Sequence, residues 1–228
     1  MTTMLYVAWL RSHGRTAGAT DDQVRRTAAW SRQAFGSRQV AAYRLTAGGS
    51  ATTQLGTQPH HLEPPFHSRL HEPEAPDTLI LAQLDGFADA RSFHATLTAA
   101  EGAPADVVDG GAYVSLQEWV AEGVDGPWGP VVHFGTYETR SPHDEWALAE
   151  FYCDVRMPEF VRRAGALRSR RLANACGAPG RTAVLYEFAS LEARLTAFEP
   201  LEVQPPAAAA QALTLHGALS PNIGTLVR

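Results

Sequence analysis

The segment 131–139, VVHFGTYET, alternates histidine and tyrosine with small or apolar residues. Successive residues of a strand point to opposite faces, so His133 and Tyr137 share one face and Val132 and Phe134 share the other. An imidazole takes up a proton near neutral pH, and a phenol donates a hydrogen bond to the oxyanion that forms. We therefore predict His133 and Tyr137 as a catalytic pair. The alternative is a core histidine satisfied by a neighbouring backbone or hydroxyl group.

The elements around this pair decide where it points. The apolar residues Val132 and Phe134 are expected to face covering helices, which would direct His133 and Tyr137 into an interior cavity. Tyr6, on the early strand LYVAWLR, is expected at the position equivalent to His133. A polar and aromatic pair of this kind, held in an apolar cavity, suits proton abstraction from an activated carbon or phenol.

Two further strands carry candidate binding residues. In AYVSLQEWV, alternation predicts that Tyr113, Gln117 and Trp119 share a face suited to an aromatic ligand, although such a stripe also occurs in plain core. Arg168 and Arg170 alternate on a later strand and are candidates to hold a carboxylate or enolate, whereas arginines at a strand edge are often only solvated. The predicted substrate-binding residues are Tyr6, Tyr113, Gln117, Trp119, Arg170 and, from a loop, His67.

The segment 46–77 is rich in glycine and proline and contains His60, His61, His67 and His71. Its histidine spacing matches no zinc template, so we predict no metal site. Long loops of this kind often serve as lids, and we expect His67 near the mouth of the cavity.

Composition excludes several functional classes. All 19 basic residues are arginines, which excludes the enzymes and nucleotide-binding loops that need a lysine nitrogen. The net charge of -5, without a basic run, argues against nucleic-acid and membrane-surface partners. The N-terminus has no signal-peptide pattern and no segment is apolar enough to cross a membrane, so we expect a cytoplasmic protein.

Hydrophobic patterns predict the order strand, helix, strand, strand, helix, strand twice along the chain. This order predicts an α+β protein of two tandem ferredoxin-like βαββαβ units, whose antiparallel sheets pack into one α/β barrel with a cavity between them. The predicted boundaries are residues 1–122 for the first unit, with the long loop 46–77, residues 123–129 for a linker and residues 130–228 for the second unit. Because one chain supplies both sheets, we expect a monomer or a homodimer.

The second unit resembles the dimeric α/β-barrel superfamily, in particular its EthD-like and antibiotic-biosynthesis-monooxygenase-like members. The resemblance covers about 48 residues. It rests on Phe151-Tyr152, Met157-Pro158, Gly165, Arg170-Arg171, the Gly177-Ala178-Pro179 turn and Tyr186-Glu187 before Ser190-Leu191-Glu192. Where that superfamily usually carries a histidine before the helix proline, this chain has Arg156, whose guanidinium group stays charged and cannot act as a base.

The resemblance implies cofactor-independent oxygenases, polyketide cyclases, decarboxylases or isomerases, and some tandem relatives bind haem. Together with the residues above, it predicts an enzyme without a cofactor that acts on a hydrophobic, aromatic or polyketide-like substrate by proton abstraction, followed by oxygenation or cyclisation. Two alternatives stay open: a small-molecule binding protein without catalysis, and a haem-dependent enzyme with an axial histidine such as His94, His133 or His216.

Overall fold

The computed structural model describes residues 4–14, 20–35, 39–46, 74–99, 101–163, 165–202, 209–210, 212–216, 219 and 222–227. The strands are β1 Met4–Ser12, β2 Val40–Leu45, β3 Thr78–Leu84, β4 Ala105–Val120, β5 Val131–Thr139, β6 Ala166–Cys176, β7 Thr182–Phe188, β8 Thr214–His216 and β9 Asn222–Leu226. The α-helices are α1 Asp21–Phe35, α2 Phe87–Ala99, α3 Pro142–Glu150, α4 Met157–Arg162, α5 Leu191–Ala193 and α6 Glu199–Glu202, and two π-helical segments are η3 Phe151–Arg156 and η4 Arg194–Phe198.

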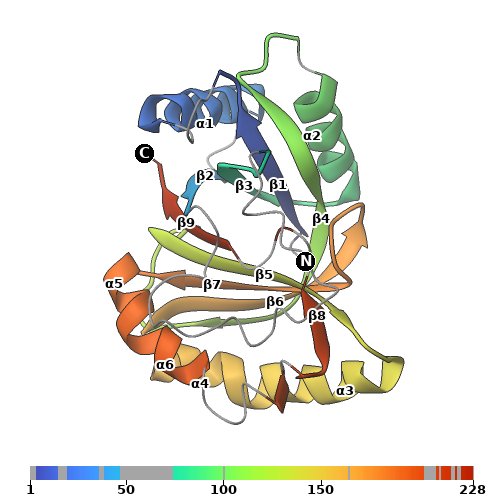
Figure 1. Ribbon diagram of the computed structural model, residues 1–228, viewed down its shortest axis with the longest axis vertical. Helices are drawn as coiled ribbons and strands as arrows, with labels where there is room; N and C mark the ends of the chain where they lie inside the picture. The colour runs from blue at the N-terminus through green and yellow to red at the C-terminus, as the bar shows by residue number, and fades with distance from the viewer. Residues whose placement is uncertain are drawn as a thin grey trace.

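The strands pair in the order β7-β6-β4-β1-β3-β2-β9-β5-β8. Since β5 also pairs with β7, eight strands close into an antiparallel barrel, and β8 extends the edge of β5 beyond β9. Figure 1 shows α1 and α2 outside β1–β4 in the upper half, and α3, α4 and α6 outside β5–β7 in the lower half. We call β1–β4 with α1 and α2 the first half, and the elements from β5 onward the second half. The expectation of an α+β barrel is confirmed.

Local sequence explains where the helices begin. Thr20 Oγ1 accepts a hydrogen bond from the Gln23 backbone N–H (3.3 Å), and Gln23 Oε1 accepts one from the Thr20 N–H (2.7 Å). This reciprocal pair is a capping box, which satisfies N–H groups that have no partner within α1. At α3, Ser141 accepts from the Asp144 N–H (3.2 Å) and Pro142 follows it, as expected for a first helical turn.

Among the described residues, the core consists of three hydrophobic clusters. The barrel interior contains Leu5, Val7, Trp9, Ala41, Tyr43, Leu79, Leu81, Tyr113, Val132, Phe134, Leu172, Ala178, Ala183, Leu185 and Leu219. A second cluster, the first-half layer, lies between β1–β4 and helices α1 and α2 and includes Tyr6, Ala8, Phe93 and Leu97. The third, the second-half layer, lies against α3–α6 and includes Tyr137, Tyr152, Phe160, Tyr186 and Phe198.

The predicted orientation of β5 is wrong. Val132 and Phe134 lie in the barrel interior, and Tyr137 lies in the second-half layer, where His133 contacts Phe198. Tyr6 likewise belongs to the first-half layer and not to the barrel. Both faces of these strands are buried, so alternation identifies the residues that share a face without indicating which layer that face contacts.

β4 begins at Ala105, seven residues before the predicted strand at Ala112, and its register with β6 shifts between Ser115 and Gln117. Such a β-bulge reverses the alternation beyond it. Glu118 therefore lies with Ser115 beside a cavity in the barrel, and Trp119 packs against the second-half layer. The predicted common face of Tyr113, Gln117 and Trp119 is wrong for this reason.

The connection between the halves packs against one end of the barrel. Arg168 donates hydrogen bonds to the carbonyl oxygens of Gly126 (2.9 Å) and Pro127 (2.8 Å), and the hydroxyl group of Tyr43 donates to that of Gly129 (3.0 Å). Residues 47–73 of the predicted loop, with His67, lie outside the described residues. Within the described parts of the chain, no helix is long and apolar enough to cross a membrane.

Candidate functional site

The second-half layer contains an unusual number of buried polar side chains for a hydrophobic core. His133 and Tyr137 project from β5, Tyr186 from β7, Tyr152 and Arg156 from η3, and Arg194 from η4, and all six are buried. Aromatic rings surround them, and the ring of Phe198 lies 4.7 Å from His133 and 5.4 Å from Tyr186 between centroids. The predicted catalytic pair thus lies in a layer where other polar groups also meet.

Two π-helical segments place the arginines of this layer. η3 ends at Arg156, directly before α4 with Pro158 in its first turn, and η4 begins at Arg194. Proline has no N–H to donate to the preceding turn, which disfavours regular α-helical bonding at that point. π-Helical turns are uncommon and are frequently found at functional sites. Their occurrence on both helical stretches over the same sheet marks this layer as a candidate active site.

Arg194 determines the hydrogen bonding of His133. Its Nη2 lies 3.0 Å from His133 Nδ1, and a guanidinium group only donates. Nδ1 of His133 is therefore the acceptor, so the neutral ring carries its proton on Nε2. In this arrangement Nε2 of His133 carries the ring proton, and the basic lone pair at Nδ1 is covered by Arg194.

The three tyrosines of the layer are donors. Burial raises the pKa of Tyr137 well above its usual value, and the neighbouring Tyr152 and Tyr186 raise it further. Burial also raises the pKa of Tyr152 and of Tyr186, although the charge of Arg156 opposes the rise in both. All three phenols consequently keep their protons at neutral pH, and none can serve as a base there.

Arg156 takes the position where the resemblance predicts a histidine. Its guanidinium carbon lies 4.4 Å from the centre of the Phe160 ring and 5.6 Å from that of Phe151, so it stacks on aromatic faces. Together with Arg194 and Nε2 of His133, it gives the layer a set of hydrogen-bond donors within an aromatic lining. Such a set stabilises an enolate or phenolate better than it binds a cation.

A second polar cluster lies inside the barrel. Arg168 and Arg170 pair with Glu118 (3.0 and 2.9 Å) and with Glu187 (3.2 and 3.6 Å). Burial raises the pKa of Glu187, while Arg170 and Arg168 act in the opposite direction, and its carboxylate also accepts the N–H of Gly129 (2.5 Å). The predicted shared face of the two arginines is confirmed.

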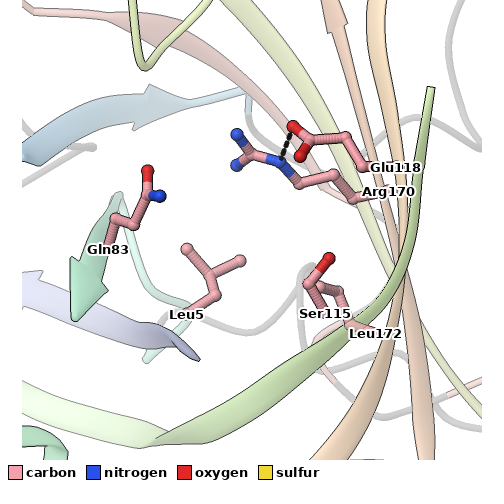
Figure 2. A pocket seen from close by; sticks show the side chains of 6 residues that line it. All are labelled: Leu5, Gln83, Ser115, Glu118, Arg170 and Leu172. Carbon is pink, nitrogen blue, oxygen red and sulfur yellow. Dashed lines mark hydrogen bonds and ion pairs between the residues drawn. The ribbon is translucent and has the colours of Figure 1, made fainter. Parts of the chain in front are cut away.

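Arg170 lines a small cavity of about 20 Å³ together with Leu5, Gln83, Ser115, Glu118 and Leu172. Figure 2 shows the Arg170 guanidinium group and the Gln83 amide extending into this space, with Leu5 and Ser115 on its other sides. That volume holds about one or two water molecules. Among the described residues, Trp9, Tyr43, Tyr113 and Phe134 are buried in the barrel interior and occupy part of the space between the sheets where a cavity is expected.

The other predicted binding residues are dispersed. Tyr6 shares a hydrogen bond of 2.6 Å with His94 of α2, and the hydroxyl group of Tyr113 donates to the carbonyl oxygen of Pro179. Gln117 Oε1 is buried without a hydrogen-bond partner among the described residues. Trp119 lies 5.9 Å from the guanidinium group of Arg162. The structure therefore groups Trp119 with the second-half layer and leaves Tyr6, Tyr113 and Arg170 in other places.

Sequence patterns did not point to Arg194. Counted from Leu191 as position i, Arg194 is at i+3 and Phe198 is at i+7, so the three share one helical stripe. Apolar residues are expected along such a stripe. A charged residue in such a stripe was the available signal. The described residues contain no group of histidine, cysteine, aspartate and glutamate arranged to hold a metal ion.

No family model and no curated protein matches this sequence. Among solved structures, a protein provisionally described as a chlorite dismutase matches with a TM-score of 0.60 and 14% identity, over 100% of this chain and 96% of that chain. The chain therefore shares the α+β barrel fold of that structure. A protein provisionally described as a monooxygenase, from Fusobacterium nucleatum, matches with a TM-score of 0.52 and 8% identity over 100% and 92% of the two chains. A major regulator of staphylococcal pathogenesis matches with a TM-score of 0.52 and 10% identity over 98% of each.

Proposed function

We propose that this chain is an enzyme that acts on an aromatic small molecule in the second-half layer, through an enolate or phenolate of that molecule. The observation that carries the proposal is the meeting of His133 with two buried arginines, both delivered by π-helical segments, inside an aromatic lining. Chlorite dismutase-like and monooxygenase-like proteins of the same fold support an enzymatic role. The order of elements in the two halves supports a tandem duplication of one ferredoxin-like unit.

The proposed chemistry begins with Arg194. A substrate oxygen that develops negative charge attracts the guanidinium group of Arg194, which then leaves Nδ1 of His133. The exposed lone pair of Nδ1 takes a proton from the adjacent carbon or hydroxyl group of the substrate. Arg194 and the phenol of Tyr137 stabilise the resulting oxyanion. Reaction of the anion with molecular oxygen as the oxidant, or its cyclisation, is the proposed next step, and a polyketide-like compound is the proposed substrate class.

Deuterium exchange tests this proposal whatever product the enzyme forms. A panel of enolisable aromatic ketones and polyhydroxylated aromatic compounds is incubated in D2O with the protein, and exchange at carbon is followed by NMR. We expect accelerated exchange for members of the panel. Binding detected by saturation-transfer NMR, without exchange for any compound bound, would instead support a binding protein.

A haem-dependent enzyme is the second candidate, and the likeness to chlorite dismutases together with the haem-binding tandem relatives supports it better than the cofactor-free proposal. Among the side chains that the structure describes in the second-half layer, however, the buried histidine is His133. Its Nδ1 is bonded to Arg194, and the rings of Phe198 and Tyr186 lie 4.7 and 5.9 Å from its ring. Arg156 cannot serve as an axial ligand. The residues of this layer, as arranged, do not fit a haem.

Titration with haemin decides between the two candidates. From the packing around His133 we expect no saturable Soret shift at micromolar haemin beyond that seen with buffer alone and with an unrelated protein. A stoichiometric Soret band would contradict this expectation. In that event a His133→Ala variant that loses the band would make His133 the ligand, whereas a variant that keeps it would place the ligand elsewhere.

A further inference from the structure

The charge cluster inside the barrel has no part in the proposed chemistry. It contains two arginines and two glutamates, and each arginine lies within 3.6 Å of both carboxylates. The cluster is therefore neutral when all four groups are ionised. A cluster with no net charge needs no bound ion to balance it. Evidence for a ligand must therefore come from differences among its four side chains.

The two glutamates differ in their access to solvent. The side chains of Arg168, Arg170 and Glu187 are 8%, 9% and 1% exposed, whereas that of Glu118 is 41% exposed. Glu187 is also held by the Gly129 N–H at 2.5 Å. Glu187 is thus a permanent internal partner of the arginines, and Glu118 is the carboxylate that can leave towards solvent.

The cavity is lined by both Arg170 and Glu118. The contacts of Arg170 with the two carboxylates use Nε and Nη1. The guanidinium group also stacks on Trp128, 5.4 Å from the ring centre, and is therefore fixed in orientation. Gln83 and Ser115 add an amide and a hydroxyl group to the lining, and Leu5 and Leu172 supply an apolar wall.

The volume of the cavity, about 20 Å³, limits a ligand to about the size of one or two water molecules. A planar anion with two oxygen atoms matches both this size and the forked geometry of a guanidinium group. The bulge between Ser115 and Gln117 brings Glu118 to the same place, and bulges near binding sites commonly redirect a side chain in this way.

We propose that the barrel cavity beside Arg170 is a binding site for a small oxyanion of the size of formate or nitrite, and that Glu118 occupies the site as an internal competitor. The ligand replaces the carboxylate of Glu118 on the two arginines, and Glu118 moves into solvent. The site is separate from the second-half layer, so anion binding there can be tested independently of the proposed catalytic chemistry.

Calorimetric titration with sodium formate and with sodium nitrite, at constant ionic strength, tests the proposal. Glu118→Gln removes the competing charge and leaves the arginines with one carboxylate, so we expect formate to bind about tenfold tighter or more than to the unmodified protein. Glu145→Gln is the control, because it removes the same charge from a surface ion pair in which Glu145 lies 3.8 Å from Arg181. We expect no increase in formate affinity from this variant. Equal affinity in the two variants would overturn the proposal.

Two further variants locate the bound ion. Gln83→Leu removes a lining amide without touching the ion pairs, so the protein should stay folded and bind formate at least about threefold more weakly in the Glu118→Gln background. Arg170→Gln in that background should abolish binding. If formate affinity is unchanged by both, the anion binds elsewhere and the proposal is wrong. Chloride that binds as tightly as formate would likewise contradict a site shaped for a planar oxyanion.

Discussion

Replacement of His133 by alanine is expected to lower the rate of carbon deuterium exchange by about 10²- to 10⁴-fold, the range associated with a general base. The ring of His133 is the one basic group that the described structure places among the donors of the second-half layer. The three tyrosines there keep their protons because burial raises their pKa values, and arginine does not deprotonate. Loss of the imidazole therefore removes the proton acceptor and leaves the oxyanion donors in place.

His143→Ala is the matched control, because His143 is an exposed histidine near the start of α3. We expect the His143→Ala variant to exchange substrate protons at the rate of the unmodified protein. Tyr137→Phe tests the second role, donation to the oxyanion, apart from proton abstraction. It should lower the exchange rate because the oxyanion loses a hydrogen-bond donor, while substrate affinity stays nearly unchanged. If His133→Ala exchanges as fast as His143→Ala, the proposed base is wrong, whatever the fate of the barrel site.

Gly111→Ala should destabilise the protein by about 3 kcal/mol, at the upper end of the usual cost of an inserted methyl group. A Cβ atom at Gly111 would lie 2.5 Å from the Cα of Ala178, and also too close to the carbonyl carbon of Gly177. These are backbone atoms, which a rotamer change cannot move. The turn that contains them is anchored by the hydroxyl group of Tyr113, which donates to Pro179, so the turn cannot retreat without losing that bond.

Gly86→Ala provides the comparison, since nothing lies within 4 Å of the Cβ atom it would add. Gly86 precedes α2 and its carbonyl accepts from Ala90, so we expect a loss of less than about 1 kcal/mol. Urea unfolding followed by circular dichroism measures both changes. Similar midpoints for the two variants would show that the turn at Ala178 adapts and that the close approach at Gly111 is not structurally required.

The pattern of residues alone identified most of the elements. Strands β1, β3, β5 and β7 follow apolar runs, and the start of α1 follows from Thr20 and the acids after it, as the capping hydrogen bonds confirm. The α+β class and the closed barrel followed from the order of these elements. These features depend on neighbours in sequence, through backbone preference and side-chain periodicity, and so they can be derived from sequence.

Other features depend on contacts between distant residues. The face of β5 that meets the helices could not be chosen from VVHFGTYET, because both faces are buried and both carry large side chains. The bulge in β4 directs Trp119 and Tyr113 to different faces of the sheet and arises from the pairing with β6. The alternation of residues in AYVSLQEWV does not indicate this bulge. Arg194 meets His133 only because η4 packs on β5, 61 residues away in sequence.

Local sequence patterns therefore predict the kinds of element, their order, the resulting fold class and the residue types available for chemistry. Packing between distant segments sets which of those residues meet. It separates Tyr6, Tyr113 and Arg170 from His133 and Tyr137, and it brings Arg194, Arg156 and Tyr186 to them. The physical reason is that periodicity acts along one chain segment, whereas burial and register are set by the surfaces that segments present to one another.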